Sequence, residues 1–223
     1  MFSKRAQEGD GLSVYRRALG ARFVLLDPLL QRYFGPVPPG STGVGHGVFE
    51  HAGYRGPRWL RPLMVIFAAA EVMFPDAASN VPFTVENTPG PGTSLRGVRL
   101  FRFPNRARRM VDAMTASRGG EVVDRVGRGG LLEVRLRPEV TRGGMRLRSV
   151  ALALRAGRLR LPLPPMASVV VDERVDRVDP ARQRVDGRVS MWPVGEIFRY
   201  RGSFTYRIQS AVGNPSAGVV PPA

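Results

Sequence analysis

The sequence predicts a β-rich α+β fold, with a large curved antiparallel sheet or open barrel of about ten strands packed around N-terminal helices. From Val81 onward, short runs alternate apolar and polar residues and are separated by Gly- and Pro-rich turns, a period of two typical of half-buried strands. In the last such run the aromatic residues share one side and the arginines share the other. They are Phe198, Tyr200, Phe204 and Tyr206, opposite Arg199, Arg201 and Arg207. An apolar segment, 58–74, precedes the strands and predicts a helix inside the fold, against the concave side of the sheet.

The folded part of the chain is expected to be one domain, 12–208. Residues 1–11 are polar and 209–223 are of low complexity, so both ends are expected to be disordered. Near the start, Ser13 can cap a first helix, and Asp27 can cap a second one that begins at Pro28.

The stretch 143–175 predicts three consecutive strands. Its apolar face changes side near Ser149 within one continuous run, and a β-bulge there would absorb the shift. Pro162, Pro164 and Pro165 follow in the next run. Because proline cannot donate to a β-ladder, this run is expected to form an edge strand or a turn.

Composition limits the possible functions. The chain has no cysteine, which excludes disulfides, thiolate metal sites and a cysteine nucleophile. No apolar leader follows the basic first residues, and the apolar run 59–74 is shorter than the roughly 20 residues that span a bilayer. We therefore expect a cytoplasmic protein that is not an integral membrane protein.

The net charge of +16 favours an anionic partner, such as nucleic acid, a membrane surface or an acidic protein. Sheets that bind nucleic acid by stacking present aromatic residues and arginines on the same exposed face. Here the two occupy opposite faces, so the aromatics are expected in the core and the arginines in solvent. Nucleic-acid binding remains an alternative that the pattern does not favour. The outward arginines include Arg135, Arg137, Arg146, Arg148, Arg155, Arg158, Arg160, Arg199, Arg201 and Arg207.

Glu173 is the main candidate site residue. It shares a strand face with Val171 and Val175, so it should point to the apolar side, where a bare carboxylate is costly. A structural interpretation pairs it with Arg99 in a buried salt bridge. A functional interpretation makes it a carboxyl group of raised pKa inside a ligand cavity. Asp112 and Asp124 are expected to lie in turns or to pair with arginines on neighbouring strands.

His46, Glu50 and His51 form the histidine-bearing cluster of the chain. An imidazole beside a carboxylate can serve acid-base or metal chemistry. On a strand, however, His46 and Glu50 would face one way and His51 the other. No metal site and no cofactor are therefore expected.

Several segments together resemble a known family. The phrases VPFTVENTP, LFRFPNRARRMVDAM, VVDRVGRGG, RLRLPLP, VVVDERVD and GEIFRYRGSF follow an N-terminal YRRALG and GVGHGVF. In this order they are similar to the bacterial proteins grouped as domain of unknown function 4166, over about Leu12 to Ile208. The resemblance implies no reaction, cofactor or catalytic residue. Some members are joined to dehydrogenase-like nucleotide-binding domains, which here would have to be a separate polypeptide.

These observations favour a non-enzymatic module that binds a hydrophobic or amphipathic, lipid-like small molecule, or a partner protein, inside a curved sheet. The candidate ligand-binding residues are Glu173, Arg99, His46 and Glu50, and none is assigned a catalytic role. Two alternatives remain. One is an enzyme, or a subunit of a redox enzyme, that uses Glu173 or His46 and Glu50 as acid and base. The other is an arginine-driven nucleic-acid binder.

Overall fold

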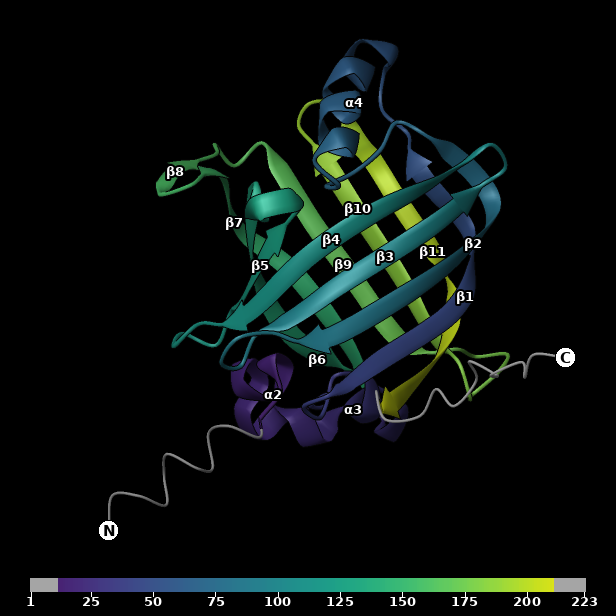
Figure 1. Cartoon of the computed structure of the whole chain (residues 1–223), viewed down its shortest axis with the longest axis vertical. Coiled ribbons are helices and arrows are strands. Elements are labelled where there is room, and N and C mark those ends of the chain that lie inside the picture. Colours follow the sequence, from purple (N-terminus) through teal and green to yellow (C-terminus); the bar gives the residue numbers. More distant parts are fainter. Residues whose placement is uncertain (1–11, 211–223) are drawn as a thin grey trace, which may run out of the picture.

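The computed structural model of the protein describes residues 12–210 (Figure 1). Its helical segments are α2 (Val14–Leu19), η1 (Gly20–Leu25), α3 (Pro28–Tyr33), η2 (Arg58–Leu60), α4 (Arg61–Ala69) and η3 (Arg128–Gly130). Its strands are β1 (Ser41–Tyr54), β2 (Ala77–Pro89), β3 (Leu95–Phe103), β4 (Arg106–Ala116), β5 (Val122–Val126), β6 (Leu132–Thr141), β7 (Gly144–Ala156), β8 (Leu159–Pro162), β9 (Ala167–Val175), β10 (Gln183–Met191) and β11 (Gly195–Ser210).

The strands form one antiparallel sheet that closes into a barrel. Their order is β6-β5-β4-β3-β2-β1-β11-β10-β9-β7-β8, and a further pairing of β6 with β7 closes ten strands, leaving β8 outside. The predicted β-rich fold of about ten antiparallel strands with N-terminal helices is confirmed. The expected disordered ends, 1–11 and 209–223, lie outside the described residues, except that Gln209 and Ser210 belong to β11.

The N-terminal helices close one end of the barrel (Figure 1). Both predicted caps are confirmed: the Ser13 hydroxyl accepts a hydrogen bond from the Arg16 amide at 3.1 Å, and Asp27 accepts one from the Leu29 amide at 2.9 Å. The amide of Asp27 also donates to the carbonyl of Gly143, at 2.8 Å, in the β6–β7 turn. Leu30 is fully buried, so α3 is fixed by both packing and hydrogen bonds.

The segment 58–74 lies at the opposite end of the barrel, across its opening (Figure 1). The prediction that it forms a helix inside the fold is wrong, since α4 ends at Ala69 and only Met64 within it is buried. Apolar residues occur on most sides of this segment, which indicated a buried helix. The barrel interior is instead lined by strand side chains, and the helix lies outside it. Within residues 12–210, no helix combines the length and apolarity needed to cross a bilayer.

Irregularities in two strands set which residues face inward. In β7, Ser149 pairs with Leu136 and Ala151 with Arg135, so Val150 is the extra residue of a bulge and the bulge predicted near Ser149 is confirmed. In β1, Glu50 is bulged between Phe49 and His51. This bulge leaves His51 outside the barrel with His46 and Glu50, contrary to the strict alternation expected from the sequence. The proline-rich run is an edge strand, β8, as expected.

Aromatic side chains fill part of the barrel interior, and glycines make room for them. Phe49 stacks on Phe83 with ring centroids 3.7 Å apart. Added Cβ atoms at Gly43 and Gly187 would overlap the rings of Tyr206 and Tyr200, so these strand glycines permit close packing rather than turns. The aromatic side of β11 therefore faces the core, as the sequence predicted.

Candidate functional site

The barrel encloses a cavity of about 380 Å³, within the range of roughly 300–1,000 Å³ that is usual for small-molecule sites. Its walls are strand side chains from most of the barrel. Tyr15 of α2 and Tyr33 of α3 bound it at one end, and Leu60, Met64 and Phe67 bound it at the α4 end. The cavity therefore spans the barrel between its two helical ends.

The half of the cavity next to α4 is apolar. The strand ends that face α4 supply inward-pointing aliphatic side chains, because the interior positions of each strand alternate with arginines and acids on the outside. These cavity residues are Val126, Leu132, Leu152, Leu154, Ala167, Val169, Val189, Met191 and Ile197.

The other half contains an ion pair between Arg99 of β3 and Asp112 of β4. The two strands are neighbours, and Asp112 lies directly opposite Gly97 in their register. A Cβ atom at position 97 would lie 2.5 Å from the Asp112 Oδ1 atom. The absence of a side chain at Gly97 thus gives the Asp112 carboxylate the space to reach Arg99.

Asp124 of β5 lies beside this pair without a partner of its own. Its Oδ1 atom is shielded from solvent and makes no hydrogen bond. Burial raises the pKa of Asp124 well above its ordinary value, and the nearby charge of Asp112 raises it further, against the opposing effect of Arg99. The group is an unfilled hydrogen-bond site on the cavity wall.

Glu173 of β9 is buried on the other side of the cavity and accepts a hydrogen bond from the side chain of Gln183 on β10. Burial raises the pKa of Glu173 to about 7, although Gln183 and Arg99 both favour the charged form. Near neutral pH this carboxyl group is close to half protonated. The Gln183 Oε1 atom, like Asp124 Oδ1, is buried without a partner.

These groups form one polar region, with Tyr200 among them. Burial raises the pKa of Tyr200 to about 12, and the charges of Arg99, Glu173, Asp112 and Asp124 all act on it. Three carboxyl groups here face one guanidinium group, so the region has spare acceptors and no spare cation. It can take up hydrogen-bond donors, such as hydroxyl or amino groups, or exchange a proton at Glu173 near neutral pH.

The structure separates the four sequence-predicted site residues. Glu173 and Arg99 both line the cavity, but the salt bridge suggested between them is wrong. Arg99 pairs with Asp112, which sits on the adjacent strand, and Glu173 is bonded to Gln183. The expected pairing of Asp112 with an arginine on a neighbouring strand is confirmed, whereas Asp124 has no arginine partner within residues 12–210.

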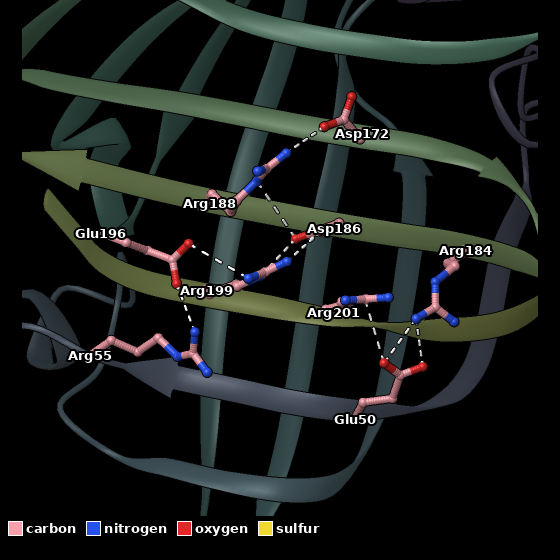
Figure 2. Close-up of polar contacts among 9 residues, drawn as sticks. All are labelled: Glu50, Arg55, Asp172, Arg184, Asp186, Arg188, Glu196, Arg199 and Arg201. Atoms are coloured by element: carbon pink, nitrogen blue, oxygen red, sulfur yellow. Dashed lines mark hydrogen bonds and ion pairs between the residues drawn. The ribbon is translucent and has the colours of Figure 1, made fainter. Parts of the chain in front are cut away.

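His46 and Glu50 lie on the outer surface of β1 and do not reach the cavity. Both carboxylate oxygens of Glu50 accept from Arg184 Nη2, at 2.7 and 2.8 Å, and Arg201 lies 3.5 Å away (Figure 2). His46 and Glu50 therefore cannot act together with Glu173 on one bound molecule.

Four outward arginines of β10 and β11 are paired with acids rather than solvated alone, namely Arg184, Arg188, Arg199 and Arg201. Arg199 holds both oxygens of Asp186, at 2.7 and 2.9 Å, and Arg188 lies 2.8 Å from Asp172 (Figure 2). Figure 2 shows these side chains crossing from strand to strand over the outside of the barrel. On this wall, much of the arginine charge is compensated within the protein.

Sequence reasoning missed several residues of the cavity. Asp124 and the two tyrosines of the N-terminal helices line it and were not proposed as site residues. Gln183, which does not line the cavity but donates a hydrogen bond to Glu173, was not proposed either. For Asp124 a signal was available, because it alternates with Val122 and Val126, the same pattern that placed Glu173 inside. Within residues 12–210, no three His, Cys, Asp or Glu side chains are grouped so as to hold a metal ion.

Two comparisons with known proteins bear on this chain. The search of curated proteins found no match. A family model matches residues 26–204, which include β1 to β10, most of β11 and the carboxyl groups of the cavity wall. The chain therefore belongs to the family described as Domain of unknown function (DUF4166).

Proposed function

We propose that the protein binds an amphipathic small molecule inside the barrel, with the apolar body of the ligand toward α4 and its polar end toward the N-terminal helices. The observation that carries this is the cavity itself, about 380 Å³ in volume, apolar at one end and polar at the other. A site of mainly apolar lining with a few convergent polar groups is the usual form of a small-molecule site.

The polar region supports a ligand whose end donates hydrogen bonds. Asp124 Oδ1, on the cavity wall, is buried without a hydrogen-bond partner in the described chain, as is the side-chain oxygen of Gln183 next to Glu173, and leaving such a group unpaired costs about 1–3 kcal/mol. A hydroxyl or amino group would satisfy one of them. At neutral pH a carboxylate would bring a further negative charge beside the Asp112 carboxylate and the partly ionised Glu173, and would be disfavoured.

Titration calorimetry with decanol, decylamine and decanoate tests both parts of the proposal. We expect decanol and decylamine to bind with one ligand per barrel, and decanoate to bind at least about tenfold more weakly at neutral pH. Equal affinity for all three, or tightest binding of decanoate, would contradict the proposed role of the carboxyl groups.

Two neighbouring residues of β9 provide a matched pair of variants. Val171 lines the cavity, whereas Val170 does not. Val171→Trp should fill the cavity and abolish decanol binding, and Val170→Trp should leave it unchanged. Retained binding in a folded Val171→Trp variant would show that the ligand lies elsewhere.

A second function is supported by one specific observation, the pKa of about 7 for Glu173 within the cavity. A carboxyl group tuned to neutral pH is suited to acid-base catalysis. The two functions differ in the fate of the ligand. An amphipath that copurifies with the protein and is recovered unchanged after incubation supports binding alone. Its conversion by the wild type but not by Glu173→Gln would assign an enzyme instead.

The nucleic-acid alternative has weaker support. Arginines on the β9–β11 wall are held by Asp172, Asp186 and Glu50, and the aromatics of β11 face inward. Neither group is then free to track phosphates or to stack on bases. Binding of single-stranded DNA that falls steeply with salt would revive this alternative.

A further inference from the structure

The α4 end of the barrel exposes large apolar side chains from several separate segments. Trp59 and Trp192 are 68% and 72% exposed, and Val65 and Ile66 are 57% and 62% exposed. Leu63 and Met166 are exposed beside them, and the amide of Trp192 donates to the Met166 carbonyl at 2.7 Å. Both tryptophans of the chain are thus in contact with solvent at one end of the molecule.

The same end carries uncompensated positive charge. Its connecting segments contain two acidic residues, Glu71 and Asp76, and Glu196 lies at the start of β11; each of the three is already in an ion pair with arginine. Arg58, Arg61 and Arg158 are exposed there and have no acidic partner within residues 12–210. The end that exposes these apolar groups therefore also carries guanidinium groups without an acidic partner in the described part of the chain.

The barrel wall is also interrupted at this end. β7 pairs with β9 only from Met145 to Arg148, and beyond that point β7 turns outward and pairs with β8. In Figure 1, β8 stands away from the barrel on the same side as α4. Leu154 and Ala167, which flank this split on β7 and β9, line the cavity. Apolar side chains thus line the cavity up to the split between β7 and β9.

We propose that this α4 face, formed by Trp59, Leu63, Val65, Ile66, Met166 and Trp192 with the surrounding arginines, docks on an anionic lipid bilayer. Tryptophan favours the membrane interface, and arginines are attracted to anionic headgroups. The docking itself is independent of the cavity. Its role, to let an amphipath pass between bilayer and barrel without crossing water, rests on the function proposed above.

A bilayer fits this face better than a protein partner does. The apolar side chains come from η2, α4 and two loops, so they are carried by separate segments of the chain. A lipid surface accommodates such separate anchors, whereas a protein interface needs a closely matched surface. The exposed arginines at this end favour an anionic lipid surface over a neutral one.

Intrinsic fluorescence offers a direct measurement, because the two tryptophans of the chain both lie on this face. The full chain is mixed with vesicles of phosphatidylcholine and phosphatidylglycerol, or of phosphatidylcholine alone. With the anionic vesicles we expect a blue shift of tryptophan emission and quenching by brominated acyl chains. Both effects should weaken in 1 M salt, where the screening length falls to about 3 Å.

A matched pair of double variants locates the contact. Val65→Ser with Ile66→Ser removes two exposed residues of α4 that do not line the cavity, and we expect it to weaken vesicle binding about tenfold in sedimentation. Val24→Ser with Leu25→Ser changes two residues of similar exposure, 65% and 63%, at the opposite end. This control should bind vesicles as the wild type does.

Unchanged tryptophan emission with anionic vesicles at low salt would overturn the docking proposal, as would equal loss of binding in both double variants. A protein that ignores vesicles but forms dimers through Val65 and Ile66 would assign the face to a second copy instead. Decanol binding in solution keeps the two proposals distinct. Decanol binding should persist in the Val65 and Ile66 double variant. If the wild-type protein does not bind decanol, the cavity function is contradicted and the docking proposal is not.

Discussion

The buried carboxyl groups of the cavity differ in how their charge is compensated. Asp112 is paired with Arg99, whereas Asp124 has no donor on Oδ1 and has a raised pKa because of burial and its neighbour Asp112. Asp112 therefore stabilises the native state as an anion. Burial favours the neutral form of Asp124.

The same substitution at these two positions should thus have unequal effects. Asp112→Asn leaves Arg99 as a buried, unpaired cation, and we expect it to lower the free energy of unfolding by about 3–5 kcal/mol. Asp124→Asn replaces a carboxyl group that has no ion-pair partner within the described residues by an amide of the same shape and should change it by less than about 1 kcal/mol. Denaturant unfolding at pH 7 measures both, and similar losses in the two variants would contradict this assignment.

Glu173 should make stability depend on pH. Its native pKa is about 7, against about 4.3 in an unfolded chain, so the native state holds the proton more tightly. The stability due to protonation is complete below the unfolded value and is lost as the pH rises through 7. Relative to Glu173→Gln, the wild type should lose up to about 1.4 kcal/mol per pH unit between about pH 4.5 and 7. Parallel pH profiles of the two proteins would show that Glu173 does not titrate in this range.

Alternation along a strand can indicate which charged residues face inward where the strand is regular, but not beyond a bulge such as that at Glu50. It placed Glu173 between Val171 and Val175, and the same rule covers Asp112 between Met110 and Met114. It could not give their partners, because a partner depends on how neighbouring strands are aligned. Asp112 reaches Arg99 because Gly97 lies directly opposite it, which only the register reveals.

At the scale of elements, the N-terminal helices are the most firmly fixed part outside the barrel. Leu30 and Phe34 are fully buried, and the Asp27 amide is bonded to the β6–β7 turn. These helices form the closed end of the cavity. Their caps could be predicted because each depends on one side chain and its own helix.

A pair of leucines tests how strongly this end is held. Leu30→Ala should lower the free energy of unfolding by about 2–5 kcal/mol, because it leaves a void under α3. Leu25→Ala removes the same atoms from an exposed position and should cost less than about 0.5 kcal/mol. If Leu30→Ala were as mild as Leu25→Ala in denaturant unfolding, α3 would not be an integral part of the barrel.

The helix at 61–69 could not be placed from sequence for a physical reason. Its apolar residues face several directions, a composition equally suited to a buried helix or to a surface that meets apolar material outside the protein. Only the barrel, closed without it, shows that Val65 and Ile66 remain exposed. The edge position of β8, by contrast, followed from its prolines, which cannot donate to a ladder.

For the whole molecule, the arrangement of polarity is the feature that matters most. The N-terminal helices close the polar end of the cavity, and the apolar end lies under α4, beside the split between β7 and β9. The outside of the β9–β11 wall is bridged by arginine–carboxylate pairs. The cavity is thus polar at one end and apolar at the other, and the apolar end is also the end of the molecule that exposes large apolar side chains.

A crystal structure of the protein saturated with decanol tests this account most directly. We predict one decanol molecule inside the barrel, with its hydroxyl group within hydrogen-bond distance of Asp124 or of the Glu173 and Gln183 pair, and its chain directed toward Met64. A cavity without decanol, or a molecule lying with its hydroxyl group toward α4, would contradict the account.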